Sequence, residues 1–286
     1  MKYKSLLLAV VFSFTLTPLA MAENAVDLFN QGVDAYDKGN YAQAALSYEK
    51  ACNGDRLSDI YSASGCYNLG LLYRKGQGVQ QSDIQAAKFY EKACNGKSAK
   101  GCFNLGFFYA KGQGVKQNYT QAAKLYEKSC YYGFGKACNN LGLLYYTGQG
   151  VKQNNIQAKI FYEKACQNNF ADGCFNLGTI YYKEKNIINA IQLLEKACNG
   201  GNMQGCYNLG MAYMNDQETP QNYIRAFQLF KKACNNNLPQ SCYNLGVLYE
   251  DIQQNRSAAK EYYGKACDLG FQQGCEGYKK LNILGY

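Results

Sequence analysis

Fourteen cysteines recur at regular spacing along this 286-residue chain, and they constrain its fold more than any other feature. All but the first pair are separated by seven residues, as in the stretch EKACNGKSAKGCFNLG from Glu91 to Gly106. Variants of this stretch return at steps of 32 to 36 residues. A sequence period in this range is typical of a solenoid, in which each repeat packs only on its neighbours.

The cysteine pairs predict structural disulfides rather than a metal site or a redox centre. Zinc-binding cysteines usually stand two to four residues apart, often with histidine, and this chain has no histidine. A thioredoxin-like centre requires Cys-x-x-Cys, which does not occur. We therefore expect no metal and no cofactor, and seven bridges within consecutive pairs. The predicted bridges are Cys52–Cys66, Cys94–Cys102, Cys130–Cys138, Cys166–Cys174, Cys198–Cys206, Cys234–Cys242 and Cys267–Cys275.

The pattern of residues 1–22 predicts a signal peptide. Export to an oxidising compartment would allow the cysteines to form disulfides. Two lysines precede an apolar run, and Ala20 and Ala22 form a small-x-small cleavage site before Glu23. A retained anchor is the alternative, but the apolar run is short. We expect residues 23–286 to form one secreted or periplasmic domain with no membrane span.

Two helical patterns alternate within each repeat. In the first, Cys102 is followed at helical spacing by Leu105, Gly106 and Tyr109, and the sixth position on is also apolar. The recurring glycine suggests that another helix packs closely there. In the second pattern, alanine and a large apolar residue stand eight and four positions before a cysteine, as suits interlocking helices. The GQGV segments between the two patterns are interpreted as turns, because a dinucleotide fingerprint would follow a strand.

The repeated frame A-x-x-GC-x-NLG-x-x-Y-x-x-G-x-GV-x-Q-x-x-x-x-A-x-x-x-Y-x-KAC resembles Sel1-like repeats, which are relatives of the tetratricopeptide repeat. The eight-residue cysteine step and the signal peptide resemble the Helicobacter cysteine-rich protein family in particular. The resemblance implies an all-α fold, a right-handed α-solenoid of about seven helix pairs stapled by disulfides. The first and last units depart from the frame, as terminal units that cap a core can do.

The resemblance implies either a protein-binding scaffold or a β-lactam-binding protein with slow β-lactamase activity. Without histidine, Ser-His-Asp and Cys-His arrangements are excluded. Ser-x-x-Lys occurs at Ser47–Lys50 and Ser257–Lys260, but the Ser-Asp-Asn and Lys-Thr-Gly motifs that accompany it in serine β-lactamases are absent. We therefore expect binding of proteins or extended peptides, with β-lactam or cell-wall-like ligands as the alternative.

Asparagine recurs two positions after a cysteine in six repeats, about 160° from the apolar stripe of the same helix. The six residues are Asn68, Asn104, Asn140, Asn176, Asn208 and Asn244. One interpretation is that each amide bonds a neighbouring helix or loop, as buried amides usually do. The other is a ladder that holds the backbone of an extended peptide, beside aromatic residues one position earlier.

Charge favours neither a nucleic-acid partner nor a catalytic pair. The formal charge of +9 falls to +7 when Lys2 and Lys4 leave with the signal, and only four basic residues are arginine, the type that base edges and phosphates favour. The Glu-Lys pair that recurs before the cysteines is interpreted as the solvated face of a helix, because a catalytic pair need not repeat.

Overall fold

The computed structural model describes residues 24–54, 60–215 and 220–286, and within them every regular element is a helix. The predicted signal peptide lies outside the described residues. The helices are α1 (Ala25–Asp37), α2 (Tyr41–Cys52), α3 (Ile60–Lys75), α4 (Asp83–Asn95), α5 (Ala99–Lys111), α6 (Tyr119–Tyr131), α7 (Gly135–Thr147), α8 (Asn155–Gln167), α9 (Ala171–Lys183), α10 (Ile187–Asn199), α11 (Met203–Asn215), α12 (Pro220–Asn235), α13 (Pro239–Asp251), α14 (Arg256–Asp268) and α15 (Gln272–Ile283). The prediction of an all-α solenoid is confirmed.

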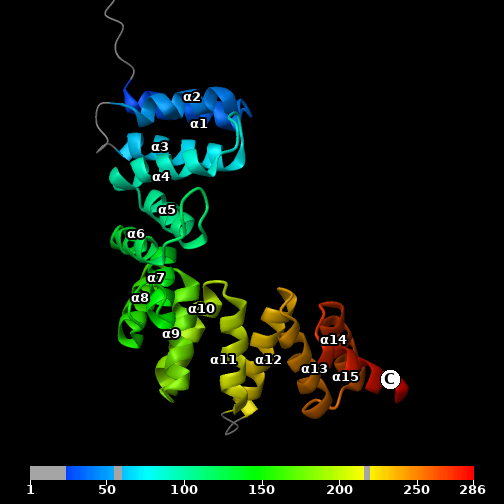
Figure 1. The fold of residues 1–286 in the computed structure, drawn as a ribbon. Coiled ribbons are helices and arrows are strands. Elements are labelled where there is room, and N and C mark those ends of the chain that lie inside the picture. The colour runs from blue at the N-terminus through cyan, green and yellow to red at the C-terminus, as the bar shows by residue number, and fades with distance from the viewer. Residues whose placement is uncertain (1–23, 55–59, 216–219) are drawn as a thin grey trace, which may run out of the picture.

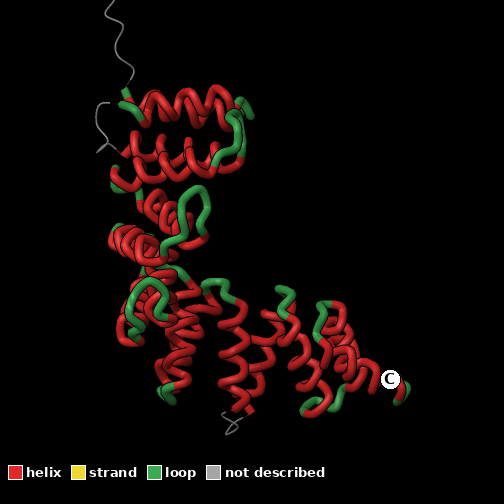
Figure 2. Tube along the Cα trace, in the orientation of Figure 1, coloured by secondary structure: helices red, strands yellow, loops and turns green. Residues whose placement is uncertain are grey.

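The helices pack in chain order into a curved, elongated stack. Figure 1 follows it from α1 and α2 through α7 and α8 to α15, and Figure 2 shows the short loops between successive helices. Odd-numbered helices are the first helices of the repeats and even-numbered ones the second. In several repeats successive first helices contact each other, as α1 contacts α3 and α7 contacts α9, while second helices meet less. The first helices therefore lie on the inner side of the curve.

The seven disulfides join each second helix to the next first helix in the predicted pairs, with Cα atoms 4.4 to 4.7 Å apart. Small residues allow this approach. A Cβ atom added to Gly101 would lie 2.6 Å from the Cβ of Ala93, and one added to Gly173 would lie 2.4 Å from the Cβ of Ala165. Carbon atoms cannot come so close, so glycine before the first-helix cysteine sets the distance between the helices.

A second glycine contact holds the two helices of a repeat together. A Cβ at Gly70 would lie 2.7 Å from the ring of Tyr90, and one at Gly106 would lie 3.0 Å from the ring of Tyr126. The close packing predicted at this glycine is confirmed. The apolar stripe is rotated slightly from the predicted one, because Phe108 at the sixth position is fully buried while Tyr109 is only half-buried.

The GQGV segments are turns, as predicted. Their second glycine is required for two reasons, its backbone conformation and its close contact with another helix. Gly114 has a φ of +63°, and a Cβ there would lie 2.3 Å from the Asp83 carbonyl oxygen on the preceding second helix. Next in the chain, Gln117 donates to the Ala110 carbonyl at 2.9 Å, and the Asn118 side chain accepts from the Gln121 amide at the start of α6. The turn thus caps both helices of its repeat.

We expect Gly173→Ala to destabilise the protein although alanine favours helices. The added methyl group would also lie 2.9 Å from the Cys166 nitrogen, so backbone has to move, and such overpacking costs about 1–3 kcal/mol. The gain in helix propensity is about 1 kcal/mol. Urea unfolding of the oxidised protein measures the net effect.

Gly264→Ala is the matched control, because Gly264 also lies inside a helix. Its added Cβ would meet only the ring of Tyr278, at 3.2 Å, and that ring is 41% exposed and free to shift. This variant should be as stable as the wild type or slightly more stable. Equal stability of the two variants would contradict the role assigned to Gly173.

Candidate ligand-binding surfaces

The six predicted asparagines form a row along the first helices, one in each of α3, α5, α7, α9, α11 and α13. All six are half-buried. The row therefore follows the inner side of the curve, but its amides are not free of the fold.

In the N-terminal half of the stack, the amides meet tyrosines of neighbouring helices. Asn68 lies close to the hydroxyl of Tyr48, and Asn140 lies close to that of Tyr126. In both cases the tyrosine belongs to the second helix of the preceding repeat. Burial raises the pKa of Tyr126, and the hydrogen bond from Asn140 opposes this rise.

Asn104 lies beside two tyrosines. It lies near the hydroxyl of Tyr67 on the preceding first helix and near the Tyr90 hydroxyl. The Tyr90 hydroxyl is nevertheless buried without a well-directed hydrogen bond.

Farther along the chain the partners differ. Asn176 donates to the Asn139 side-chain oxygen at 2.8 Å, and Asn244 lies 3.1 Å from the sulfur of Met211. Asn208 accepts from Gln204 at 3.5 Å.

The change of partner has a local cause in two repeats. The second-helix residue that faces Asn208 or Asn244 is Leu194 or Phe230, and neither has a hydroxyl group. Each amide uses only part of its capacity of two donated and two accepted bonds, so the internal contacts leave positions for a ligand.

The structure places Asn68 in a pocket of about 200 Å³ on the first-helix side of the N-terminal repeats. Tyr36, Tyr48, Lys75 and Gln77 also line this pocket. The Oε1 atom of Gln77 is buried and has no hydrogen-bond partner, which is unusual for a buried acceptor. The equivalent atom of Gln113, one repeat later, is in the same state. Both atoms are shielded from solvent, so an amide N–H of a ligand would satisfy either one only after the glutamine side chain turns outward.

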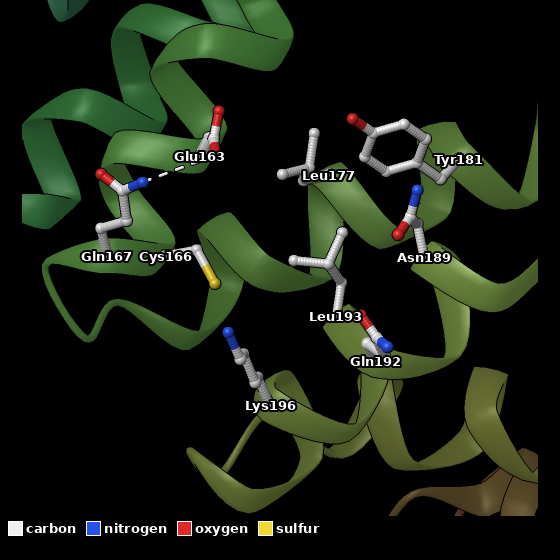
Figure 3. Close-up of a pocket in the computed structure, with 9 residues that line it drawn as sticks. All are labelled: Glu163, Cys166, Gln167, Leu177, Tyr181, Asn189, Gln192, Leu193 and Lys196. Atoms are coloured by element: carbon white, nitrogen blue, oxygen red, sulfur yellow. Dashed lines mark hydrogen bonds between the residues drawn. The ribbon is translucent and has the colours of Figure 1, made fainter. Parts of the chain in front are cut away.

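A second kind of pocket lies between successive second helices (Figure 3). Between α8 and α10 it has a volume of about 260 Å³ and a floor of Leu177 and Tyr181 from α9. Glu163 and Lys196 stand on opposite sides. The same repeat positions line another pocket of about 470 Å³ between α10 and α12. Sequence analysis did not single out these pockets, because they arise from the gap between helices a whole repeat apart.

The two Ser-x-x-Lys matches lie in different surroundings. Ser47 is 2% exposed, so its hydroxyl cannot meet a substrate in this fold. Ser257 is exposed at the start of α14, and Lys260 donates to Asn282 and to the carbonyl of Tyr286. That lysine is thus held by the C-terminal end of the chain.

Other sources of chemistry are limited in the described residues. All fourteen cysteines are in disulfides, so none supplies a thiolate. Within the described ranges, no three acidic or cysteine side chains converge as metal ligands would. The pockets are lined by amides, aromatic rings, apolar side chains and a few charged groups.

These features define a disulfide-stapled repeat protein, and comparison with known families identifies which one. The Sel1 repeat model matches residues 63–98, 99–133, 135–170, 204–238 and 239–271, more than half of the chain. A tetratricopeptide repeat model matches residues 171–199. The chain belongs to the Sel1 repeat family.

Individual relatives agree with this assignment. The chain is 36% identical over 63 residues to the putative beta-lactamase HcpC of Helicobacter pylori, and the match covers 22% of this chain and 20% of that protein. The matched part is thus about a fifth of that relative's length. The resemblance to the Helicobacter cysteine-rich proteins is confirmed.

Solved structures show the same fold over most of the chain. A protective antigen of uropathogenic Escherichia coli strains has a TM-score of 0.79 at 23% identity, covering 91% of this chain and 57% of that one. A Sel1 repeat protein from Oxalobacter formigenes has a TM-score of 0.69 at 24% identity, covering 84% of this chain and 96% of that one. At these identities the likeness extends to the fold alone.

We expect Tyr90→Phe to leave the free energy of unfolding at pH 7 unchanged or to raise it. The change removes a buried hydroxyl that has no well-directed partner, and another repeat already carries Phe230 at this position. Tyr126→Phe is the matched control and should cost about 1 kcal/mol, because it takes away the partner of Asn140.

The same variant has a distinct signature at alkaline pH. Burial raises the pKa of Tyr90 to about 12, while a tyrosine in the unfolded chain has a pKa of about 10. The folded protein therefore keeps a proton that the unfolded chain releases, and its stability falls as the pH rises from 10 towards 12. Tyr90→Phe should remove up to about 2–3 kcal/mol of this fall. If the free energy of unfolding in urea fell as steeply between pH 10 and 12 in Tyr90→Phe as in the wild type, the raised pKa assigned to Tyr90 would be contradicted.

Proposed function

We propose that this protein is an exported scaffold that binds other proteins through extended peptide segments on its first-helix face. The observation that carries the proposal is the row of half-buried asparagines on that face, together with the unpartnered Oε1 atoms of Gln77 and Gln113. Sel1 and tetratricopeptide repeats generally bind proteins, which supports the same conclusion.

The spacing of the first helices suits an extended peptide. Packed helices lie about 8–10 Å apart, and an extended chain advances roughly 3.3 Å per residue. One first helix would therefore meet about every third peptide residue. Amide side chains both donate and accept, so Asn68 and Gln77 could hold a peptide backbone whatever its side chains. Tyr36 and Tyr48 would contact one side chain of the same peptide.

The sequence and the disulfides support export. Residues 1–22 have the pattern of a signal peptide, and structural disulfides are typical of oxidising compartments. Among the described residues, no helix combines the length and apolar character that a bilayer-spanning segment requires. On the signal-peptide pattern and the disulfides, we propose a secreted or periplasmic protein in which residues 23–286 form one solenoid.

Replacing Gln77 by alanine should weaken the binding of peptides that occupy the first-helix face. Dodecapeptides selected on the wild type from a random display library provide the probes. Losing one buried hydrogen bond costs about 1–3 kcal/mol, which raises the Kd of such a peptide about 5- to 150-fold. The fold should be unaffected, because the Oε1 atom of Gln77 makes no internal bond.

Gln149→Ala is the matched control, since Gln149 occupies the same turn position and is exposed. Peptides whose affinity is insensitive to Gln77→Ala, and also to Asn68→Ala in a protein with a normal thermal melt, do not use this face. A selection that yields only such peptides would refute the proposal.

The alternative is a slow β-lactamase that binds β-lactam or cell-wall-like ligands, and the name of the relative HcpC, a putative beta-lactamase, favours it. The burial of Ser47 and the engagement of Lys260 argue against a serine nucleophile. We expect purified protein and its Ser257→Ala variant to hydrolyse a chromogenic β-lactam equally slowly. Rapid turnover that Ser257→Ala abolishes would establish the enzyme instead.

A further inference from the structure

The second helix α12 differs in charge from the other second helices. In five of them a glutamate stands three positions before the cysteine, whereas α12 carries Lys231 there. The five glutamates are Glu49, Glu91, Glu127, Glu163 and Glu195. Together with Arg225 and Lys232, Lys231 gives α12 three cations, and the helix sequence contains no acidic residue. The negative charge that five second helices carry at this position is replaced by a positive charge in α12.

Lys231 stands at the rim of an apolar pocket of about 520 Å³ between α12 and the end of α13. Ile224 and Phe227 line it from α12, and Leu248 and Ile252 line it from the other side. Ile224 is 56% exposed and Ile252 is 53% exposed, so the pocket opens to solvent with large apolar side chains at its edge.

The opposite side of α12 faces the pocket between α10 and α12. Arg225 lies over the ring of Tyr213, with its guanidinium carbon 5.4 Å from the ring centre, and donates to the Tyr213 hydroxyl at 3.2 Å. Lys232 donates to the Cys198 carbonyl at 3.1 Å. Both cations are thus held at this pocket, and Glu195 is the acidic group that lines it.

One helix therefore presents an apolar pocket and a cationic pocket side by side. Residues 223, 224, 227 and 231 face the apolar pocket, and residues 225, 229 and 232 face the cationic one. Gln228 lies between the two groups and lines both pockets. A ligand that crosses α12 at Gln228 contacts both.

We propose that this surface of α12 binds an extended peptide that carries a large apolar side chain next to acidic residues. The apolar side chain enters the pocket at Ile224 and Phe227, and the carboxylates pair with Lys231 and Arg225. Gln228 and Gln253 supply the donors and acceptors that a peptide backbone requires, and a purely hydrocarbon ligand would not use them.

The charge balance of the surface supports an acidic partner. Among the described residues that line the two pockets, Glu195 is the one acid, and Asp251 stands next to the lining residue Ile252 in the chain. Three cations of α12 outnumber these two carboxylates, and residues 23–286 have a formal charge of +7, which is the +9 of the whole chain less Lys2 and Lys4. Opposite charge accelerates association and selects against basic partners. This site is separate from the first-helix face, so it goes beyond the function proposed above.

The test is selection of a random dodecapeptide display library on the wild type, with counter-selection on the double variant Ile224→Ser/Lys231→Glu. We expect the surviving peptides to combine a leucine or phenylalanine with aspartate or glutamate. A synthetic, fluorescein-labelled peptide of this class should lose at least tenfold in affinity on the double variant. Its affinity should also fall as NaCl rises from 50 to 300 mM, because the charged contacts are exposed.

Matched controls separate this site from general effects. Ile188→Ser changes the equivalent isoleucine of α10, which is 74% exposed, and Lys124→Glu makes the same charge change on α6; neither should alter binding. Gln77→Ala should also have no effect, so failure at α12 is distinguishable from failure of the first-helix proposal.

Three outcomes would overturn the proposal. In the first, the counter-selection leaves no class of peptides that combine acidic and large apolar residues. In the second, a peptide analogue with lysine in place of the acidic residues binds with equal affinity. In the third, the Ile188→Ser variant loses peptide binding. Dimerisation of the wild type that the double variant abolishes, without peptide binding, would assign the surface to a second copy of the chain instead. Circular dichroism of each variant shows whether its fold is intact.

Discussion

The close approach of two helices at each disulfide is the constraint on which the rest of the structure depends. A glycine or another small residue stands before the first-helix cysteine and meets a small residue of the preceding helix, as Gly101 meets Ala93. This contact brings the two cysteine Cα atoms to 4.4 Å. It also fixes the angle at which each repeat follows the last. The disulfide then restricts the conformations open to the unfolded chain. In the chain-entropy account, closing a loop of this length stabilises the folded protein by about 2–3 kcal/mol.

Repetition makes the interior of this protein nearly uniform, so its differences are informative. Tyrosine, leucine and phenylalanine exchange at one second-helix position, and in the two repeats with leucine or phenylalanine there, Asn208 and Asn244 have other partners. These changes give each half-buried amide one internal contact and are explained by the fold. The lysine at position 231 satisfies no buried group and lies at the rim of an apolar pocket, so stability does not explain it. Function is best sought at such departures from the repeat.

The sequence predicted some parts of the candidate sites and could not predict others. The row of asparagines was visible because its spacing repeats with the cysteines. The second-helix residues next to them were not, although Tyr126 and Asn140 stand fourteen residues apart, as do Tyr90 and Asn104. That constant spacing was the available signal. It becomes meaningful only when the second helix of one repeat is known to face the first helix of the next. Similarly, the unpartnered oxygen of Gln77 depends on which groups happen to lie within reach.

By itself, the sequence determined the helix pairs, the turns and the disulfides. Each of these depends on residues close together in the chain, and local spacing is enough to specify a helix, a glycine turn or a bridge across a short loop. Only the tertiary structure decided which surfaces could bind a ligand. The pockets at Asn68 and along α12 lie between helices of successive repeats, and their shape depends on the angle and distance between those helices. Small side chains at the junctions set both quantities, and a linear pattern does not reveal how far apart two packed helices will lie.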